Sequence, residues 1–128
     1  MNFKRLPEFE KELKALTKRW PSLPKDLSIA EQVISTLYAD QEGVDRTELR
    51  KNFFNNKRAT ILSVKESYEA VKMRIDGASL GSKDCMRLVF VYVYDGVSVV
   101  LIEIYSKTDK PCEDAKRLQG FLSDNLTE

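Results

Sequence analysis

The alternation of apolar and polar positions is clearest in the second half of the chain, where it predicts strands. Four runs have the alternation or the β-branched and aromatic content typical of strands, at residues 59–64, 69–76, 86–93 and 97–105. The turn sequence Tyr94-Asp95-Gly96 separates the last two runs. They are therefore predicted to pair as an antiparallel hairpin at the centre of a sheet.

The length of that turn decides which side chains share a face of the sheet. A two-residue turn at Asp95-Gly96 would set Arg87 opposite Ile104, whereas a three-residue turn that includes Tyr94 would set Arg87 opposite Glu103. The three-residue turn is favoured because it gathers an almost wholly apolar face that helices can cover. That face consists of Leu88, Phe90, Tyr92, Val100, Ile102 and Ile104.

Helical periodicity precedes and follows the strands. Apolar residues recur at helical spacing over 7–19, and Pro7 suits the first turn of that helix. The proline-rich run 20–24 ends it. A capping-box pattern and an apolar stripe predict a second helix over 28–38, antiparallel to the first. The stripe Ala115, Leu118, Phe121 and Leu122 predicts a closing helix after Pro111.

Shorter segments complete the expected architecture. Residues 1–6 suit an edge strand, 46–54 suit one or two helical turns, and 77–83 suit a loop. The order of elements predicts an α+β fold in which an N-terminal helical hairpin packs on one face of a small antiparallel sheet, with a C-terminal helix. The length suits one domain over residues 1–128.

Composition indicates the protein's cellular environment more clearly than its chemical activity. The chain has 21 basic and 20 acidic residues, so no overall field favours a nucleic acid or a membrane partner. No run approaches the roughly 20 apolar residues that a spanning helix needs, and no signal sequence is evident. Cys85 and Cys112 lack metal-ligand spacing. A soluble, unsecreted, cytoplasmic chain without a bound metal is expected.

The sequence contains no histidine, which excludes histidine-dependent nucleophiles, acid–base pairs and metal sites. The glycine-containing run 77–83 lacks the spacing of a phosphate-binding loop. What remains is a mainly basic set around adjacent strand ends and loops. Its members are Lys72, Arg74, Lys83, Arg87, Glu103, Tyr105, Lys107 and Lys110.

That set has two interpretations. Guanidinium and ammonium groups can grip a phosphodiester and stabilise the charge that grows on its oxygens, and RNA supplies its own 2′-hydroxyl nucleophile. The alternative is a structural role, in which these residues form cross-strand ion pairs, for example Arg87 with Glu103, or solvated edges of the sheet.

Five short motifs, taken in order, resemble the RelE/ParE superfamily of bacterial toxins, and the RelE branch more closely. They are FEKEL at 9–13, WPSL at 20–23, VKMR at 71–74, MRLVF at 86–90 and IYSK at 104–107. The resemblance implies a small antiparallel sheet under two helices and a cognate antitoxin that wraps the protein. On the RelE branch it implies cleavage of messenger RNA on the ribosome, with neither metal nor cofactor.

The resemblance also implies roles for individual cations. Lys72 and Arg74 match basic positions on a central strand and would position the RNA backbone. Arg87 matches the arginine that begins the next strand and would stabilise the developing phosphorane charge. Lys107 or Lys110 would assist the leaving oxygen, with Lys110 and Lys83 as further RNA-binding residues.

The residue that removes the proton is open among Glu103, Tyr105 and a lysine of depressed pKa. RelE has a tyrosine in its final helical segment, whereas residues 112–117 contain none here, so Tyr105 would be a substitute. Residues 41–56 form an apparent insertion. The alternative function is a non-catalytic toxin-fold binding protein, such as a ParE-like inhibitor of DNA gyrase.

Overall fold

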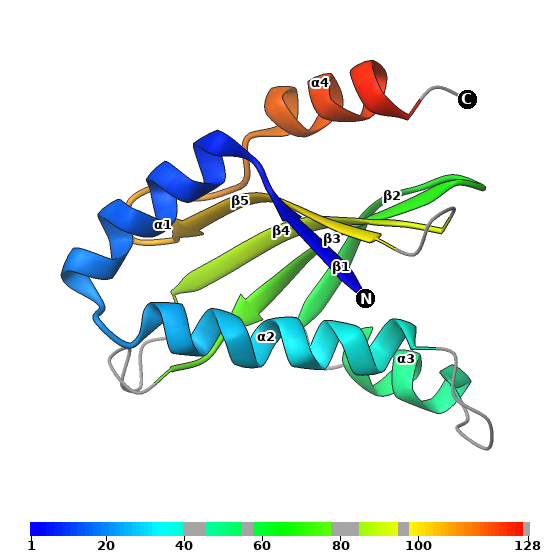
Figure 1. The fold of residues 1–128 in the computed structure, drawn as a ribbon, viewed down its shortest axis with the longest axis horizontal. Coiled ribbons are helices and arrows are strands. Elements are labelled where there is room, and N and C mark those ends of the chain that lie inside the picture. The colour runs from blue at the N-terminus through cyan, green and yellow to red at the C-terminus, as the bar shows by residue number, and fades with distance from the viewer. Residues whose placement is uncertain (40–45, 55–57, 78–84, 95–97, 127–128) are drawn as a thin grey trace.

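The fold is that of a computed structural model that describes residues 1–39, 46–54, 58–77, 85–94 and 98–126. The elements in these ranges are β1 (Asn2–Arg5), α1 (Pro7–Arg19), α2 (Leu23–Tyr38), α3 (Arg46–Phe54), β2 (Ala59–Val64), β3 (Tyr68–Ile75), β4 (Met86–Val93), β5 (Ser98–Ser106) and α4 (Ala115–Asn125) (Figure 1). The predicted α+β class is confirmed. Residues 78–83 of the predicted loop, and Asp95 and Gly96 of the predicted turn, lie outside the described residues.

The strands form one mixed sheet in the order β1-β5-β4-β3-β2. The pairs β5-β4, β4-β3 and β3-β2 are antiparallel, as predicted, but β1 pairs parallel with β5. The expected edge strand is present, and the purely antiparallel sheet is wrong. The pattern of so short a strand does not reveal its direction, because alternation is the same in parallel and antiparallel pairing.

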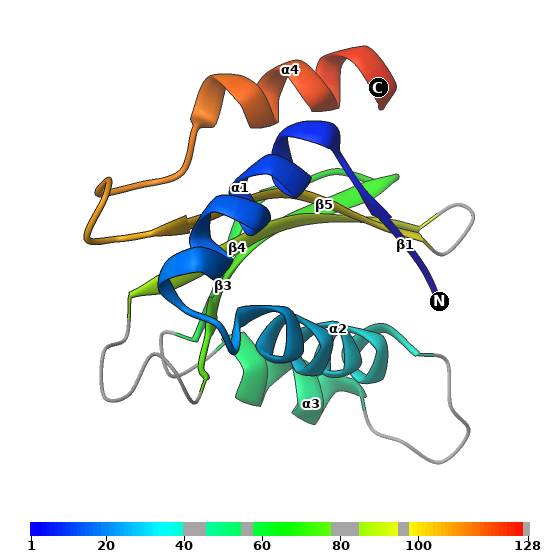
Figure 2. The same ribbon diagram turned by 60° about the vertical axis from the view of Figure 1, so that its left-hand side comes forward.

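Helices cover both faces of the sheet rather than one. α4 lies over one face, while α2 and α3 lie under the other (Figures 1 and 2). α1 packs against β5, and it diverges from α2 beyond the turn that joins them. The expectation that helices cover only one face is therefore wrong, although the buried side chains of α1 and α2 do share one core. The reason is that nearly every side chain of β4 and β5 is buried, so both faces of the hairpin need an apolar cover.

α2 begins at Leu23, earlier than the capping-box pattern indicated. Pro24 falls in its first turn, where the missing N–H costs no intrahelical bond. The Ser22 hydroxyl donates to Asp26 at 2.6 Å instead of capping the helix. At the other end of the chain, Asp114 caps α4 by accepting the N–H of Arg117 at 3.0 Å.

The favoured register of the central hairpin is wrong. Val93 pairs with Ser98, the ladder shifts between Val89 and Phe90, and beyond the shift Arg87 lies opposite Tyr105. β5 therefore contains a bulge, an extra residue that a run of apolar side chains cannot reveal. Val100 and Ile102, predicted on the face of Leu88 and Phe90, belong instead to the core under α4. That core also contains Val89, Val91 and Tyr105, whereas the core under α2 contains Leu88, Phe90, Tyr92, Val99, Leu101 and Ile104.

A buried polar cluster joins α2 and α3 to the sheet. Glu69 on β3 is 2% exposed and accepts hydrogen bonds from the phenol of Tyr38 and from both terminal nitrogens of Arg50, at 2.6 and 3.2 Å. The Tyr38 ring stacks on Tyr92 with centroids 4.0 Å apart, and Arg50 lies over Phe54. The buried Glu69 carboxylate therefore has partners for both of its oxygens, which is the condition for burying its charge.

Candidate functional site

Strand alternation brings three predicted cations to the face of the sheet that α4 covers. On β3, Lys72 and Arg74 alternate in phase with the Tyr68 and Ala70 side chains of the core under α4. Arg87 alternates in the same phase with the β4 side chains of that core. Arg74 is the direct cross-strand partner of Arg87.

The Arg74 and Arg87 pairing is unusual for a sheet. Directly opposite side chains have Cβ atoms roughly 4.5–5.5 Å apart, and like charges at such positions destabilise the pair. Arg87 is also only 8% exposed, and its Nη1 donates to the carbonyl oxygen of Met86 at 3.1 Å. Two guanidinium groups on neighbouring central strands form a place that a bound anion would stabilise.

The bulge in β5 adds a carboxylate to the same face. Because Glu103 lies opposite Val89, it faces α4 and is not the cross-strand partner of Arg87. Glu103 is 1% exposed, accepts the backbone N–H of Asp114 at 2.8 Å, and forms an ion pair with Lys110. Its carboxylate thus ties the loop between β5 and α4 to the sheet.

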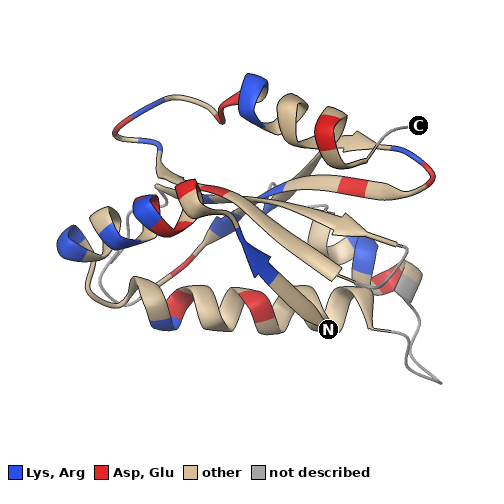
Figure 3. Cartoon of the chain, turned by 45° about the horizontal axis from the view of Figure 1, so that its top comes forward, with Lys and Arg blue, Asp and Glu red and all other residues tan. Residues whose placement is uncertain are grey.

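Lys72 has an acidic partner that sequence reasoning missed. Glu113, in the loop before α4, accepts a hydrogen bond from the Lys72 ammonium group at 2.8 Å. The loop alternates basic and acidic residues (Figure 3). The acidic pair Glu113-Asp114 beside basic residues was the available signal, but a loop has no periodicity from which to infer its direction.

Tyr105 lies opposite Arg87, and the ammonium group of Lys110 is 5.1 Å from the centre of its ring. Burial, followed by the negative charges of Glu113 and Glu103, raises the pKa of Tyr105 to about 12. The phenol therefore keeps its proton near neutral pH. On this face it suits a hydrogen-bond or proton donor better than a base.

The remaining predicted site residues lie at the margin. Lys107 is exposed just beyond β5, and its backbone N–H donates to the carbonyl oxygen of Cys85 at 2.7 Å. Lys83 lies outside the described residues. The fold thus brings together Lys72, Arg74, Arg87, Glu103, Tyr105 and Lys110, with Lys107 at the end of the same strand as Tyr105.

Arg117 at the start of α4 is a second residue that sequence reasoning missed. Its guanidinium group donates to both carboxylate oxygens of Glu12 on α1, at 2.8 and 3.0 Å, and to the carbonyl oxygen of Ile102 in the bulge. Burial alone would lower the pKa of Arg117, but the hydrogen bonds and charge of Glu12 raise it overall. Arg117 therefore remains charged and holds the first turn of α4 to both α1 and β5.

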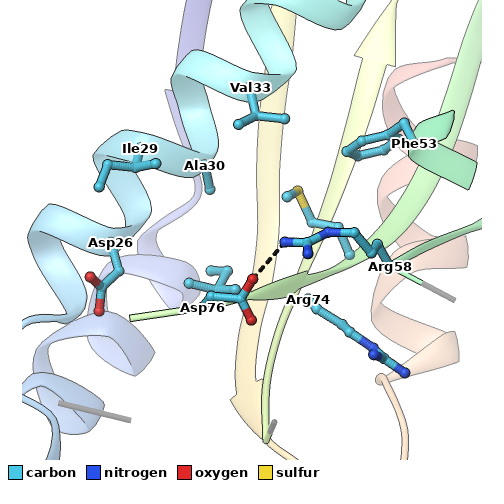
Figure 4. A pocket seen from close by; sticks show the side chains of 10 residues that line it. Asp26, Ile29, Ala30, Val33, Phe53, Arg58, Arg74 and Asp76 are labelled. Carbon is cyan, nitrogen blue, oxygen red and sulfur yellow. Dashed lines mark hydrogen bonds and ion pairs between the residues drawn. The ribbon is translucent and has the colours of Figure 1, made fainter. Parts of the chain in front are cut away.

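A cleft of about 90 Å³ lies on the other face of the sheet, between α2 and β3 (Figure 4). Its lining is mainly apolar and includes Ile29, Val33 and Phe53, with an Arg58 to Asp76 ion pair of 2.5 Å. Figure 4 shows the Arg74 side chain extending away from the α2 residues. Arg74 also lines this cleft, so the cleft borders the candidate site at that residue.

Comparisons of the chain with protein-family models, curated proteins and solved structures found no match. Within the described ranges, no group of three or more His, Cys, Asp or Glu side chains is arranged to hold a metal ion. No helix there is both long enough and apolar enough to cross a membrane.

Proposed function

We propose that the chain is a RelE-like toxin that cleaves messenger RNA on the ribosome without a metal ion and is neutralised by a cognate antitoxin. The observation that carries this proposal is the like-charged pair Arg74 and Arg87, on the same face as Lys72 and Tyr105. Two opposed guanidinium groups repel each other across the ladder, whereas a phosphodiester between them would gain charge-assisted hydrogen bonds. Messenger RNA is proposed as the substrate because of the motif resemblance to the RelE branch.

The proposed reaction is an internal transesterification. The RNA 2′-oxygen forms a bond to the adjacent phosphorus, the bond from phosphorus to the 5′-oxygen breaks, and a 2′,3′-cyclic phosphate and a 5′-hydroxyl result. Arg87 donates to the phosphoryl oxygens as their charge grows, and Lys72 and Arg74 hold the backbone. Tyr105 suits protonation of the leaving 5′-oxygen because its raised pKa keeps the phenol protonated.

Two further roles, those of the base and of the lysine at the leaving oxygen, are assigned from where the residues lie. Glu103 accepts the 2′-hydroxyl proton, since a carboxylate is ready to accept one whereas a lysine must first lose its own. Lys107 or Lys110 supports the leaving oxygen electrostatically. Because Glu103 is bonded to Lys110, the base becomes available as the lysine turns toward the phosphate.

Replacement of Arg87 by alanine tests the proposal. Loss of one preorganised charge contact lowers turnover by roughly a hundred- to a thousandfold in comparable sites. Arg87→Ala should cleave ribosome-bound message more slowly by that factor. The unmodified protein should still cleave it in the presence of EDTA. Arg5→Ala is the matched control, because Arg5 lies on the edge strand β1 and pairs with Glu31 on α2 at 3.0 Å. A folded Arg87→Ala protein that cleaves at the unmodified rate would rule out this site.

The partner is tested in cells. Expression of the chain alone should slow growth and translation, and coexpression of a small protein encoded beside it should restore both. Normal growth at high levels of folded protein, with no neighbouring partner, would contradict the toxin proposal.

A non-catalytic binding function is the second candidate, and one observation favours it. Lys72 and Lys110 each already hold a carboxylate, from Glu113 and Glu103. A site with its lysines neutralised would suit binding more than turnover. Under this alternative, the purified protein inhibits DNA gyrase supercoiling or binds another target and leaves ribosome-bound message intact.

A further inference from the structure

We propose that Glu113 acts as an internal competitor for the anion-binding site, with its carboxylate at Lys72 in the position that a ligand phosphate takes. The segment 107–114, here named the strap, carries Glu113 from the end of β5 to β3. Ligand binding then requires Glu113 to leave Lys72. The identity of the natural ligand, RNA, rests on the proposed function. The contact between Lys72 and Glu113 does not.

The contact between Lys72 and Glu113 resembles an anion-binding site that is already occupied. Lys72 and Glu113 are 41 positions apart in sequence, yet the ammonium nitrogen lies 2.8 Å from Oε1 of the carboxylate. Their side chains are 27% and 17% exposed, so the contact is partly shielded from water. An ammonium group binds carboxylate and phosphate oxygens through the same charge-assisted hydrogen bonds. Glu113 therefore occupies the Lys72 ammonium group, to which a phosphate would otherwise bind.

The carboxylate is charged at neutral pH. Burial alone would raise the pKa of Glu113, but the hydrogen bond from Lys72 and the charges of Lys72 and Lys110 lower it overall. Glu113 also contributes to the raised pKa of Tyr105, so its charge acts on the candidate proton donor too. Glu113 thus interacts electrostatically with two residues of the same site, Lys72 and Tyr105.

Other contacts hold the strap without Glu113. Asp114 donates its backbone N–H to Oε1 of Glu103 at 2.8 Å. α4 is held by Leu118 and Leu122 in the core and by Arg117 bonded to Glu12. Because these contacts are independent of Lys72, Glu113 can move away while α4 stays docked.

The test compares two strap carboxylates. Glu113→Gln removes the charge at Lys72 and keeps the side-chain shape. Asp109→Asn is the matched control, because it removes the same charge from the same strap, where Asp109 instead pairs with Arg19 at 2.7 Å. Both variants change the net charge equally, so a difference between them reports the local contact.

Two probes are titrated against the full chain and followed by fluorescence anisotropy and calorimetry. The first is a labelled 2′-O-methyl RNA oligonucleotide, which lacks the nucleophile and cannot be cleaved by transesterification. The second is inorganic pyrophosphate, which tests the cations without any RNA structure. Glu113→Gln should bind both probes about three- to tenfold more tightly than the unmodified protein, a change typical of the net contribution of one intramolecular hydrogen bond. Asp109→Asn should bind as the unmodified protein does.

A double-mutant cycle assigns the effect to Lys72. In a Lys72→Gln background, Glu113→Gln should leave both affinities unchanged, because the contact is already absent. An equal gain with and without Lys72, or an equal gain from Asp109→Asn, would show a general charge effect and overturn the inference. If Glu113→Gln does not fold, Glu113→Asp keeps the charge but shortens the reach, and it should also tighten binding.

The outcomes separate this inference from the proposed function. Tighter pyrophosphate binding by Glu113→Gln, with no RNA bound by any variant, supports the competitor and argues against the RNA function. RNA binding of equal strength by the unmodified and Glu113→Gln proteins overturns the competitor and leaves the RNA function standing.

Discussion

Arg74 on β3 lies directly opposite Arg87 on β4, so two positive charges share one position of the ladder. Replacing Arg74 by threonine, a good strand former, should raise the free energy of unfolding by about 0.2–1 kcal/mol at low salt. The gain should shrink at high salt, where screening weakens the repulsion in the unmodified protein.

Urea denaturation at two salt concentrations measures this effect. Under the proposed function, RNA binding by Arg74→Thr should weaken at the same time, because Arg74 is proposed to hold the RNA backbone. A variant that is less stable at both salt concentrations would show that Arg74 supports the fold instead.

Phe90 on β4 is fully buried, and its ring is nearly perpendicular to that of Tyr38 on α2. Phe90→Ala should lower the free energy of unfolding by about 3–5 kcal/mol, because it removes a large side chain and leaves a cavity. Val64→Ala on the exposed edge strand, where the side chain is 54% exposed, should change stability by less than about 0.5 kcal/mol. A loss below about 1 kcal/mol for Phe90→Ala would contradict its assignment to the core.

Tyr38 donates its phenolic hydrogen to the buried carboxylate of Glu69. Tyr38→Phe keeps the ring stack on Tyr92 and removes this donor, so it should cost about 1.5–3 kcal/mol, as for hydrogen bonds to charged groups. Tyr68→Phe is a matched control, because the Tyr68 hydroxyl lies 3.4 Å from Ser63 and should cost about 1 kcal/mol or less. Chemical denaturation of the two variants measures the difference, and equal losses would contradict a special role for Glu69.

Tyr105 links stability to alkaline pH. Its pKa is about 12 in the folded chain against an ordinary value of 10.0, with burial as the first cause. The unfolded state therefore loses the phenolic proton first as the pH rises. The stability from this group is fully present below about pH 10 and is lost between about pH 10 and 12.

Thermal unfolding midpoints across that pH range provide the measurement. Tyr105→Phe cannot ionise at this position, so its midpoint should fall less steeply than that of the unmodified protein. Parallel pH profiles for the two proteins would show that Tyr105 titrates alike in both states.

Local physics made much of the secondary structure predictable from the sequence. A helix over 7–19 follows from apolar spacing along one face, and the strands of the central hairpin follow from their β-branched and aromatic content. Alternation likewise sets Lys72 and Arg74 on one side of β3, because successive strand residues point to opposite faces. These features depend on neighbours within a few residues, and the sequence contains that information directly.

Tertiary structure alone decided which of these side chains meet. The bulge in β5 sets Arg87 opposite Tyr105 and Glu103 opposite Val89, although the local pattern is as compatible with an unbroken ladder. Glu113 reaches Lys72 across 41 positions because α4 folds over the sheet. Such contacts depend on strand register and on the path of a loop. Both are set by packing the whole core, because long-range contacts leave no period in the sequence.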